Sequence, residues 1–116
     1  MSQERIYKSA NCFQPADGEP IRSVVAESPE AVIVAWHVKP GQHIAAHVHP
    51  HGQDTWTILS GQGEYQIDET GAKRPIAAGD IAIANTGKVH GVFNNGSEPL
   101  LFVSVVSPGN AGYEPL

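Results

Sequence analysis

The sequence predicts an all-β protein, built as a sandwich or barrel, and three observations lead to this prediction. Short runs rich in Val, Ile and other β-type residues recur at intervals of roughly 8–12 residues along most of the chain. Its 12 Gly and 9 Pro stand mainly between these runs, where they mark turns. No segment of about ten residues or more shows the spacing of an amphipathic helix.

The chain is expected to divide into an N-terminal arm over residues 1–20, a barrel over 21–107 and an irregular tail over 108–116. The arm is polar and carries Pro15, Pro20 and the turn signal Asp17-Gly18. The first four strands are expected where β-branched and apolar residues gather: 21–26, 31–38, 43–49 and 55–59. Turn signals close the first three at 27–30, 40–41 and 50–52.

Five more strands complete the expected barrel: 64–68, 73–77, 80–84, 90–93 and 100–106. Glycine-containing turns at 60–63, 70–71, 78–79, 86–87 and 94–96 separate them. The run at 100–106 is the most apolar of the chain. A jelly-roll arrangement of such strands protects their edges and leaves a mouth for a ligand.

Composition excludes several classes of partner. The net charge is −5, and the seven Lys and Arg form no cluster, so neither nucleic acid nor an anionic membrane is expected to bind. Cys12 is the single cysteine, which excludes an internal disulfide and fits a reducing compartment. Residues 1–11 lack the apolar core of a secretion signal, and no run approaches the ~18 apolar residues of a membrane span. A cytoplasmic protein is expected.

Three histidines follow one another at alternate positions: His47, His49 and His51. Alternate strand residues project to one face, which places His47 and His49 about 7 Å apart at ~3.4 Å per residue. Pro50 is expected to end the strand before His51. His90, brought alongside on another strand, is the candidate third nitrogen ligand for a metal ion.

Glycines frame this histidine pair at fixed distances. Five residues separate Gly41 from His47, four separate His49 from Asp54, and six separate Asp54 from Gly61. Around the third histidine, Gly79 is followed by five residues, Asn85-Thr86-Gly87, two residues, His90, three residues and Asn94. The spacing resembles the two motifs of the cupin superfamily in its small, single-domain form. Here Asp54 stands for the usual Glu and Asn85 for the usual Pro.

This resemblance implies a double-stranded β-helix, or jelly-roll, barrel with a metal held by His47, His49, His90 and an acid. Two residues compete for the acid position. Gln53 fits the three-residue spacing from His49, whereas Asp54 fits the distance to Gly61 and offsets the charge of the ion. Asp54 also shares strand parity with Trp56 and Ile58, so it is favoured to face inward. His51 remains an alternative ligand because Asp is shorter than Glu.

Three imidazoles and a carboxylate favour one Fe(II) or Mn(II) ion, while Ni(II), Cu(II) and Zn(II) remain feasible. Open positions beside such an ion allow a small oxygen-bearing ligand or dioxygen to bind. Tyr65 alone among the candidate wall residues offers a hydroxyl as donor or acid. The pocket wall is expected from large inward side chains: Trp56, Tyr65, Ile83, Phe93 and Phe102.

Two classes of function follow from this site. The first is a non-haem metal-dependent dioxygenase or related oxidoreductase acting on a small oxygen-bearing substrate. The second is a module that binds or senses a metal and a small ligand without turnover. A sugar or keto-acid isomerase, which some cupins are, is a third reading and depends on Tyr65. The apolar runs 31–36 and 100–106 further lead us to expect a homodimer.

Overall fold

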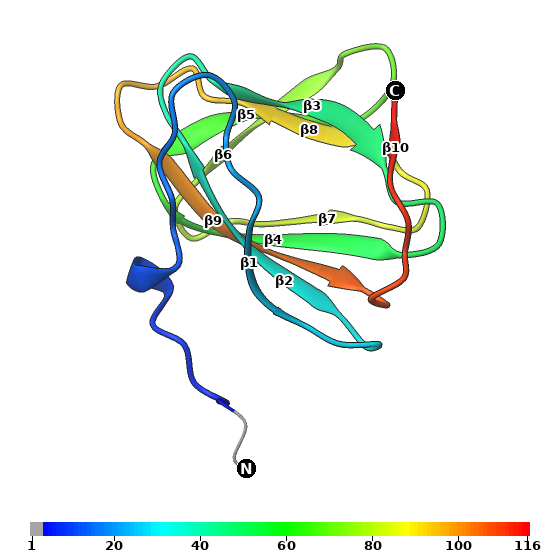
Figure 1. The fold of residues 1–116 in the computed structure, drawn as a ribbon. Helices are drawn as coiled ribbons and strands as arrows, with labels where there is room; N and C mark the ends of the chain where they lie inside the picture. The colour runs from blue at the N-terminus through cyan, green and yellow to red at the C-terminus, as the bar shows by residue number, and fades with distance from the viewer. Residues whose placement is uncertain (1–3) are drawn as a thin grey trace.

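The computed structural model describes residues 4–116, which form two five-stranded antiparallel sheets (Figure 1). The first sheet has the order β1-β2-β9-β4-β7, with bounds Ser23–Glu27, Val32–Val38, Leu100–Ser107, Gln53–Ser60 and Ile81–Ala84. The second has the order β10-β3-β8-β5-β6, with bounds Glu114–Pro115, His43–Val48, His90–Phe93, Gln62–Gln66 and Lys73–Ala77. The prediction of an all-β jelly-roll barrel is confirmed.

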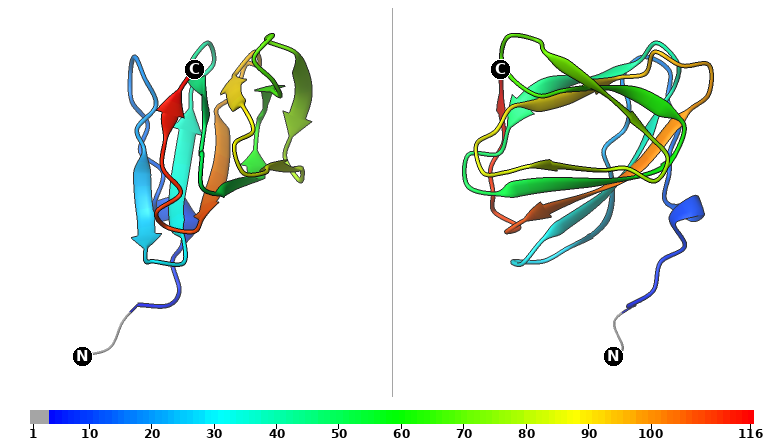
Figure 2. Two further views of the ribbon diagram at one scale, coloured as in Figure 1. Left: turned by 90° about the vertical axis from the view of Figure 1, so that its right-hand side faces the viewer. Right: turned by 180° about the vertical axis from the view of Figure 1, so that it is seen from behind.

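The two sheets face each other and enclose one hydrophobic core (Figure 2). Trp56 on β4 is stacked on Phe102 of β9 at 4.1 Å between ring centroids, and Tyr65 of β5 meets it edge-on at 5.2 Å. Burial of large apolar side chains of this kind contributes about 1.5–3 kcal/mol each. The core cluster holds the following residues: Val38, Trp56, Ile58, Tyr65, Ile76, Ala82, Val92, Leu100 and Phe102.

All nine expected strands are present, and their ends differ from the expected limits by no more than two residues. The tail contains a strand that was not expected, because β10 pairs with β3 through Glu114 opposite Val48 and Pro115 opposite His47. Two residues, one of them proline, carry no readable strand pattern.

The segment before β1 contains one 3₁₀ turn, η1 (Ser9–Asn11), and then runs along the barrel (Figure 1). The Ser23 hydroxyl donates to the Cys12 carbonyl at 2.6 Å and accepts from the Gln14 side chain at 2.9 Å. Farther along, the Gln42 side chain donates to the Ala16 carbonyl at 2.7 Å. These bonds fix the backbone that leads into β1.

Within residues 4–116, no helix has the length and apolar character needed to cross a bilayer. The division into arm, barrel and tail remains a prediction, and so does the homodimer. Size-exclusion chromatography with light scattering would test the latter.

Candidate metal centre

Two histidines of the expected site lie on neighbouring strands of one sheet, and the third, His49, directly follows the last residue of β3. His47 on β3 is directly paired with His90 on β8, so the two side chains project from the same face and their ring centroids lie 4.2 Å apart. The pairing of β3 with β8 is irregular between Ile44 and His47. At this point the β3 backbone comes so close that a Cβ on Gly91 would lie 2.8 Å from the Ile44 carbonyl. Such bulges re-aim side chains, and here the bulge immediately precedes a site residue.

Asp54 reaches the same place from the opposite sheet. It lies on β4 between β7 and β9, and its alternation with Trp56 and Ile58 turns all three side chains inward. The carboxylate is only 3% exposed. One oxygen, Oδ1, accepts a short hydrogen bond from the Ser104 hydroxyl on β9. The other, Oδ2, faces the histidines.

Each histidine is oriented by a backbone carbonyl that contacts its Nδ1 atom. The partners are Ala45 O for His47 at 2.8 Å, Gly112 O for His49 at 2.7 Å and Lys88 O for His90 at 3.1 Å. A carbonyl only accepts hydrogen bonds, so each Nδ1 carries the proton and donates it. The lone pair of each neutral ring therefore lies on Nε2, which is the arrangement typical of metal-ligating histidine.

The Nε2 atoms of His49 and His90 lie 3.2 Å and 2.9 Å from Asp54 Oδ2. With Nδ1 already donating, a neutral imidazole would set its Nε2 lone pair against a carboxylate oxygen. A positive charge must therefore lie between these atoms, either as protons on the rings or as a metal ion. One ligand atom from each of four residues, namely His47, His49, Asp54 and His90, lies within 4.8 Å of the others. The cluster could hold a metal ion.

The protonation equilibria of the cluster follow from burial and these contacts. Burial lowers the pKa of His47 to about 4, so this imidazole is neutral and available at neutral pH. Burial also opposes the charge of His49, but hydrogen bonds with Asp54 and Gly112 outweigh it and raise its pKa. For Asp54, burial is likewise outweighed by hydrogen bonds from His49, His90 and Ser104, which hold its pKa well below the usual range.

The two alternative ligands lie outside this cluster. Gln53 stands at the other parity of β4, and its side chain donates to Thr55 Oγ1 at 3.1 Å while accepting from Asn85 at 3.2 Å. His51 is exposed on the turn after β3 and is not among the four clustered residues.

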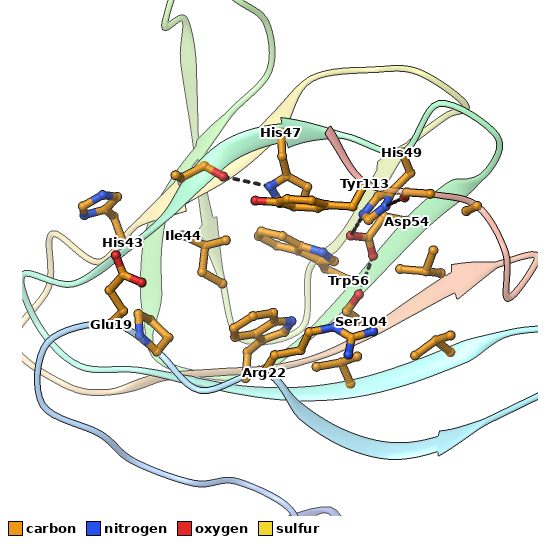
Figure 3. A pocket seen from close by; sticks show the side chains of 18 of the residues that line it. Glu19, Arg22, His43, Ile44, His47, His49, Asp54, Trp56, Ser104 and Tyr113 are labelled. Atoms are coloured by element: carbon orange, nitrogen blue, oxygen red, sulfur yellow. Dashed lines mark hydrogen bonds and ion pairs between the residues drawn. The ribbon is translucent and has the colours of Figure 1, made fainter. Parts of the chain in front are cut away.

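A pocket of about 600 Å³ opens beside the cluster, with His47, His49, Asp54 and Ser104 in its wall (Figure 3). The larger side chains of its apolar wall are Val32, Val34, Trp36, Ile44, Trp56 and Val106. This volume is in the range of small-molecule sites.

Of the five expected wall residues, only Trp56 lines this pocket. Tyr65 and Phe102 lie in the core cluster instead. The placement of Ile83 is corrected, because its side chain is 54% exposed on the outer face of β7, opposite Thr55. The prediction that Phe93 lines the pocket is also wrong. Phe93 stands three residues from His90 on β8, so its side chain takes the opposite face of the sheet and lines a separate depression.

The structure also brings in residues that the sequence reasoning missed. Arg22, in front of β1, lines the pocket, and Tyr113 packs on the ring of His47 with 5.0 Å between centroids. Gly112 holds His49 from the same tail segment. Nothing in the local sequence signals these contacts, because they depend on how the arm and the tail return to the barrel.

Comparison with known proteins agrees with this architecture. The family model described as the cupin domain matches residues 34–106. A solved Klebsiella pneumoniae protein with a double-stranded β-helix domain is 55% identical, with 97% of each chain covered and a TM-score of 0.94. A cupin protein from Desulfovibrio desulfuricans shares the fold at 23% identity and a TM-score of 0.75, covering 93% of this chain and 97% of that one.

An oxalate-binding protein from Thermotoga maritima is 31% identical over 67 residues, which are 58% of this chain and 54% of the relative. The chain thus spans about half the length of this curated relative. The family match, in contrast, covers more than half of the chain and contains the three histidines and Asp54. The protein therefore belongs to the cupin family.

Proposed function

We propose that this protein binds one divalent transition-metal ion through His47, His49, His90 and Asp54, and that the ion holds a small oxygen-bearing ligand in the adjacent pocket. The observation that carries the proposal is the contact of two Nε2 atoms with Asp54 Oδ2, at 3.2 and 2.9 Å, while each Nδ1 donates to a carbonyl. Three nitrogens and one carboxylate oxygen, with no thiolate, favour Fe(II) or Mn(II).

The residues around the ligands support this role. The carbonyls of Ala45, Gly112 and Lys88 fix the tautomer of each ring, and the Ser104 hydroxyl fixes the carboxylate. Four protein ligands would leave an octahedral ion with room for a small ligand. A bound ion would supply Lewis acidity and, for a redox metal, a place for dioxygen.

The finer proposal is an oxidoreductase of the non-haem dioxygenase class. The pocket with an apolar wall beside the four clustered residues supports it, as does the likeness to a protein named for binding oxalate, a molecule with adjacent oxygen atoms. An isomerase is not proposed, because Tyr65 lies in the core and burial raises its pKa further above the usual value. That hydroxyl is no proton donor to the pocket.

Metal binding is tested by the metal content of purified protein and by chelator competition. We expect Asp54→Ala and His47→Ala to lose most of the bound Mn(II), whereas Gln53→Ala should retain it and serves as the matched control. Metal at 100 times its Kd should stabilise the parent by about 2.7 kcal/mol. Equal metal content in Asp54→Ala and the parent would overturn the ligand assignment.

Turnover is tested separately with Fe(II)-loaded protein, by oxygen uptake in the presence of diketones, thiols and catechols. Uptake that disappears in His47→Ala supports the dioxygenase. Tight binding of a panel member without any uptake identifies a binding module instead, and that second function would then replace the first.

A further inference from the structure

Among the described residues, one Lys or Arg side chain lines the pocket: Arg22, which directly precedes β1. Its position is set by its neighbour. Ser23 is buried and tied to the Cys12 carbonyl and the Gln14 side chain. Adjacent residues of an extended chain point to opposite sides, so anchoring Ser23 to the arm, on the sheet face away from the pocket, directs Arg22 toward the cavity. In Figure 3 the guanidinium lies below Ser104, on the side of the pocket that holds Asp54.

This guanidinium has no counter-ion among residues 4–116. The ion pairs found there join Lys39 to Asp17 and two histidines to Asp54, and none includes Arg22. Both oxygens of Asp54 are already engaged, by Ser104 and by the histidines. Glu19, the other acid of the lining, lies beside His43 at the opposite end of the pocket (Figure 3).

The charges of the pocket therefore favour an anion. A divalent ion would exceed the single negative charge of Asp54, and Arg22 adds a further positive charge beside it. Guanidinium groups bind carboxylates through paired, charge-assisted hydrogen bonds. A locally positive pocket in a chain of net charge −5 would attract such a ligand specifically to this end of the barrel.

Apolar side chains next to Arg22 are suited to the rest of the ligand: β2, which pairs with β1, carries Val32, Val34 and Trp36, and Ile44 lies on β3 of the other sheet. Val32, Val34, Trp36 and Ile44 form an apolar surface in a cavity of about 600 Å³. A two-carbon diacid would leave most of this surface uncovered, whereas an aryl or branched chain would bury it.

We infer that Arg22 is a specificity-determining residue that receives the carboxylate of a small organic monoacid, whose apolar chain lies against Val34, Trp36 and Ile44. A second oxygen of the same ligand reaches the metal centre. This inference deepens the proposed function and rests on it for the second oxygen and for the ion's share of the positive charge, whereas the contact of Arg22 with the carboxylate needs no metal.

The test uses phenyllactate as the probe, because it combines a carboxylate, a neighbouring hydroxyl and an aryl chain. Lactate lacks the apolar chain, phenylpropanediol lacks the carboxylate, and oxalate is the short diacid. Dissociation constants are measured by titration calorimetry on Mn(II)-loaded and on metal-free protein. Arg22→Gln removes the charge, Arg22→Lys keeps it without the paired donors, and Arg74→Gln on exposed β6 is the matched control.

We expect the loaded parent to bind phenyllactate at least about tenfold more tightly than lactate, oxalate or the diol. Arg22→Gln should weaken phenyllactate about 10- to 100-fold, as expected for a hydrogen bond to a charged group, and leave the diol unchanged. The phenyllactate affinity of Arg22→Lys should lie between those of the parent and Arg22→Gln, and the affinity of Arg74→Gln should equal that of the parent. Metal content should be equal in all four proteins.

An unchanged affinity in Arg22→Gln, a diol that binds as tightly as phenyllactate, or tighter binding of oxalate would overturn the inference. Failure of the parent to bind Mn(II) would overturn the proposed function instead. In that case the ratio of affinities between parent and Arg22→Gln, measured on metal-free protein, still decides whether Arg22 receives the carboxylate.

Discussion

Asn94, the last residue of the second motif, is predicted to hold the barrel together without taking part in metal binding. Its side chain is fully buried and lies just after β8. The amide nitrogen donates to the carbonyls of Val38 and Glu98, both at 2.9 Å, and the amide oxygen accepts from the backbone of Gly96 at 2.8 Å. One side chain thus joins the end of β2 to the turn that leads into β9.

Replacing Asn94 by Ala removes all three hydrogen bonds. At about 1 kcal/mol each, with a further cost for the Val38 carbonyl left unpaired, the free energy of unfolding should fall by about 3–5 kcal/mol. For a chain of this length that corresponds to a loss of roughly 12–20 °C in Tm. Asn94→Asp should be at least as harmful, because a carboxylate cannot donate to two carbonyls.

Urea denaturation of the metal-free protein measures this effect as a lower midpoint with an unchanged m-value. Asn95→Ala, at the exposed neighbouring position, is the control and should stay within about 0.5 kcal/mol of the parent. The metal affinity of folded Asn94→Ala should equal that of the parent. A loss below about 1 kcal/mol, or an Asp variant as stable as the parent, would refute this reasoning.

Three further predictions concern the site and its frame. Because the pKa of His47 lies near 4 in the folded state and near 6.5 in the unfolded chain, the metal-free protein should lose up to about 3 kcal/mol of stability as the pH falls from 6.5 to 4. His47→Gln should flatten that part of the curve in urea titrations. Ser104→Ala should weaken Mn(II) binding about 10- to 100-fold in chelator competition by freeing Asp54 Oδ1, and an unchanged affinity would deny Ser104 this role. Gly61→Ala, whose Cβ would clash with the Pro99 carbonyl at φ +83°, should cost about 3 kcal/mol or more. Gly79→Ala, at φ +95° with open space around it, should cost about 1 kcal/mol, and equal thermal shifts would contradict this ranking.

The sequence predicted the strands well because their apolar runs are bounded by glycine and proline turns. It predicted the inward position of Asp54 because parity along β4 ties it to Trp56 and Ile58. The same parity rule predicts that Phe93 faces away from the site, because it stands three residues from His90. For Ile83 no such signal exists, because every residue of β7 is apolar and only its pairing with β4 reveals the face.

The remaining parts of the site depend on contacts between distant segments. Arg22 enters the pocket because the arm anchors Ser23, and the Gly112 carbonyl reaches His49 because β10 joins the edge of β3. No local pattern in the sequence indicates either contact. Long-range packing of a polar arm and a short tail becomes visible only in the folded chain.

The hydrogen bond from His49 to the Gly112 carbonyl has a consequence for how the protein is produced. If the site binds metal as proposed, a purification handle fused after Leu116 that disturbs the pairing of β10 with β3 should weaken metal retention without replacing a ligand. The arm, by contrast, leads into β1, which lies in the other sheet from β10, so a handle fused ahead of it should leave that pairing intact. Preparations that differ only in which end carries the handle should therefore not be pooled when metal occupancy is compared.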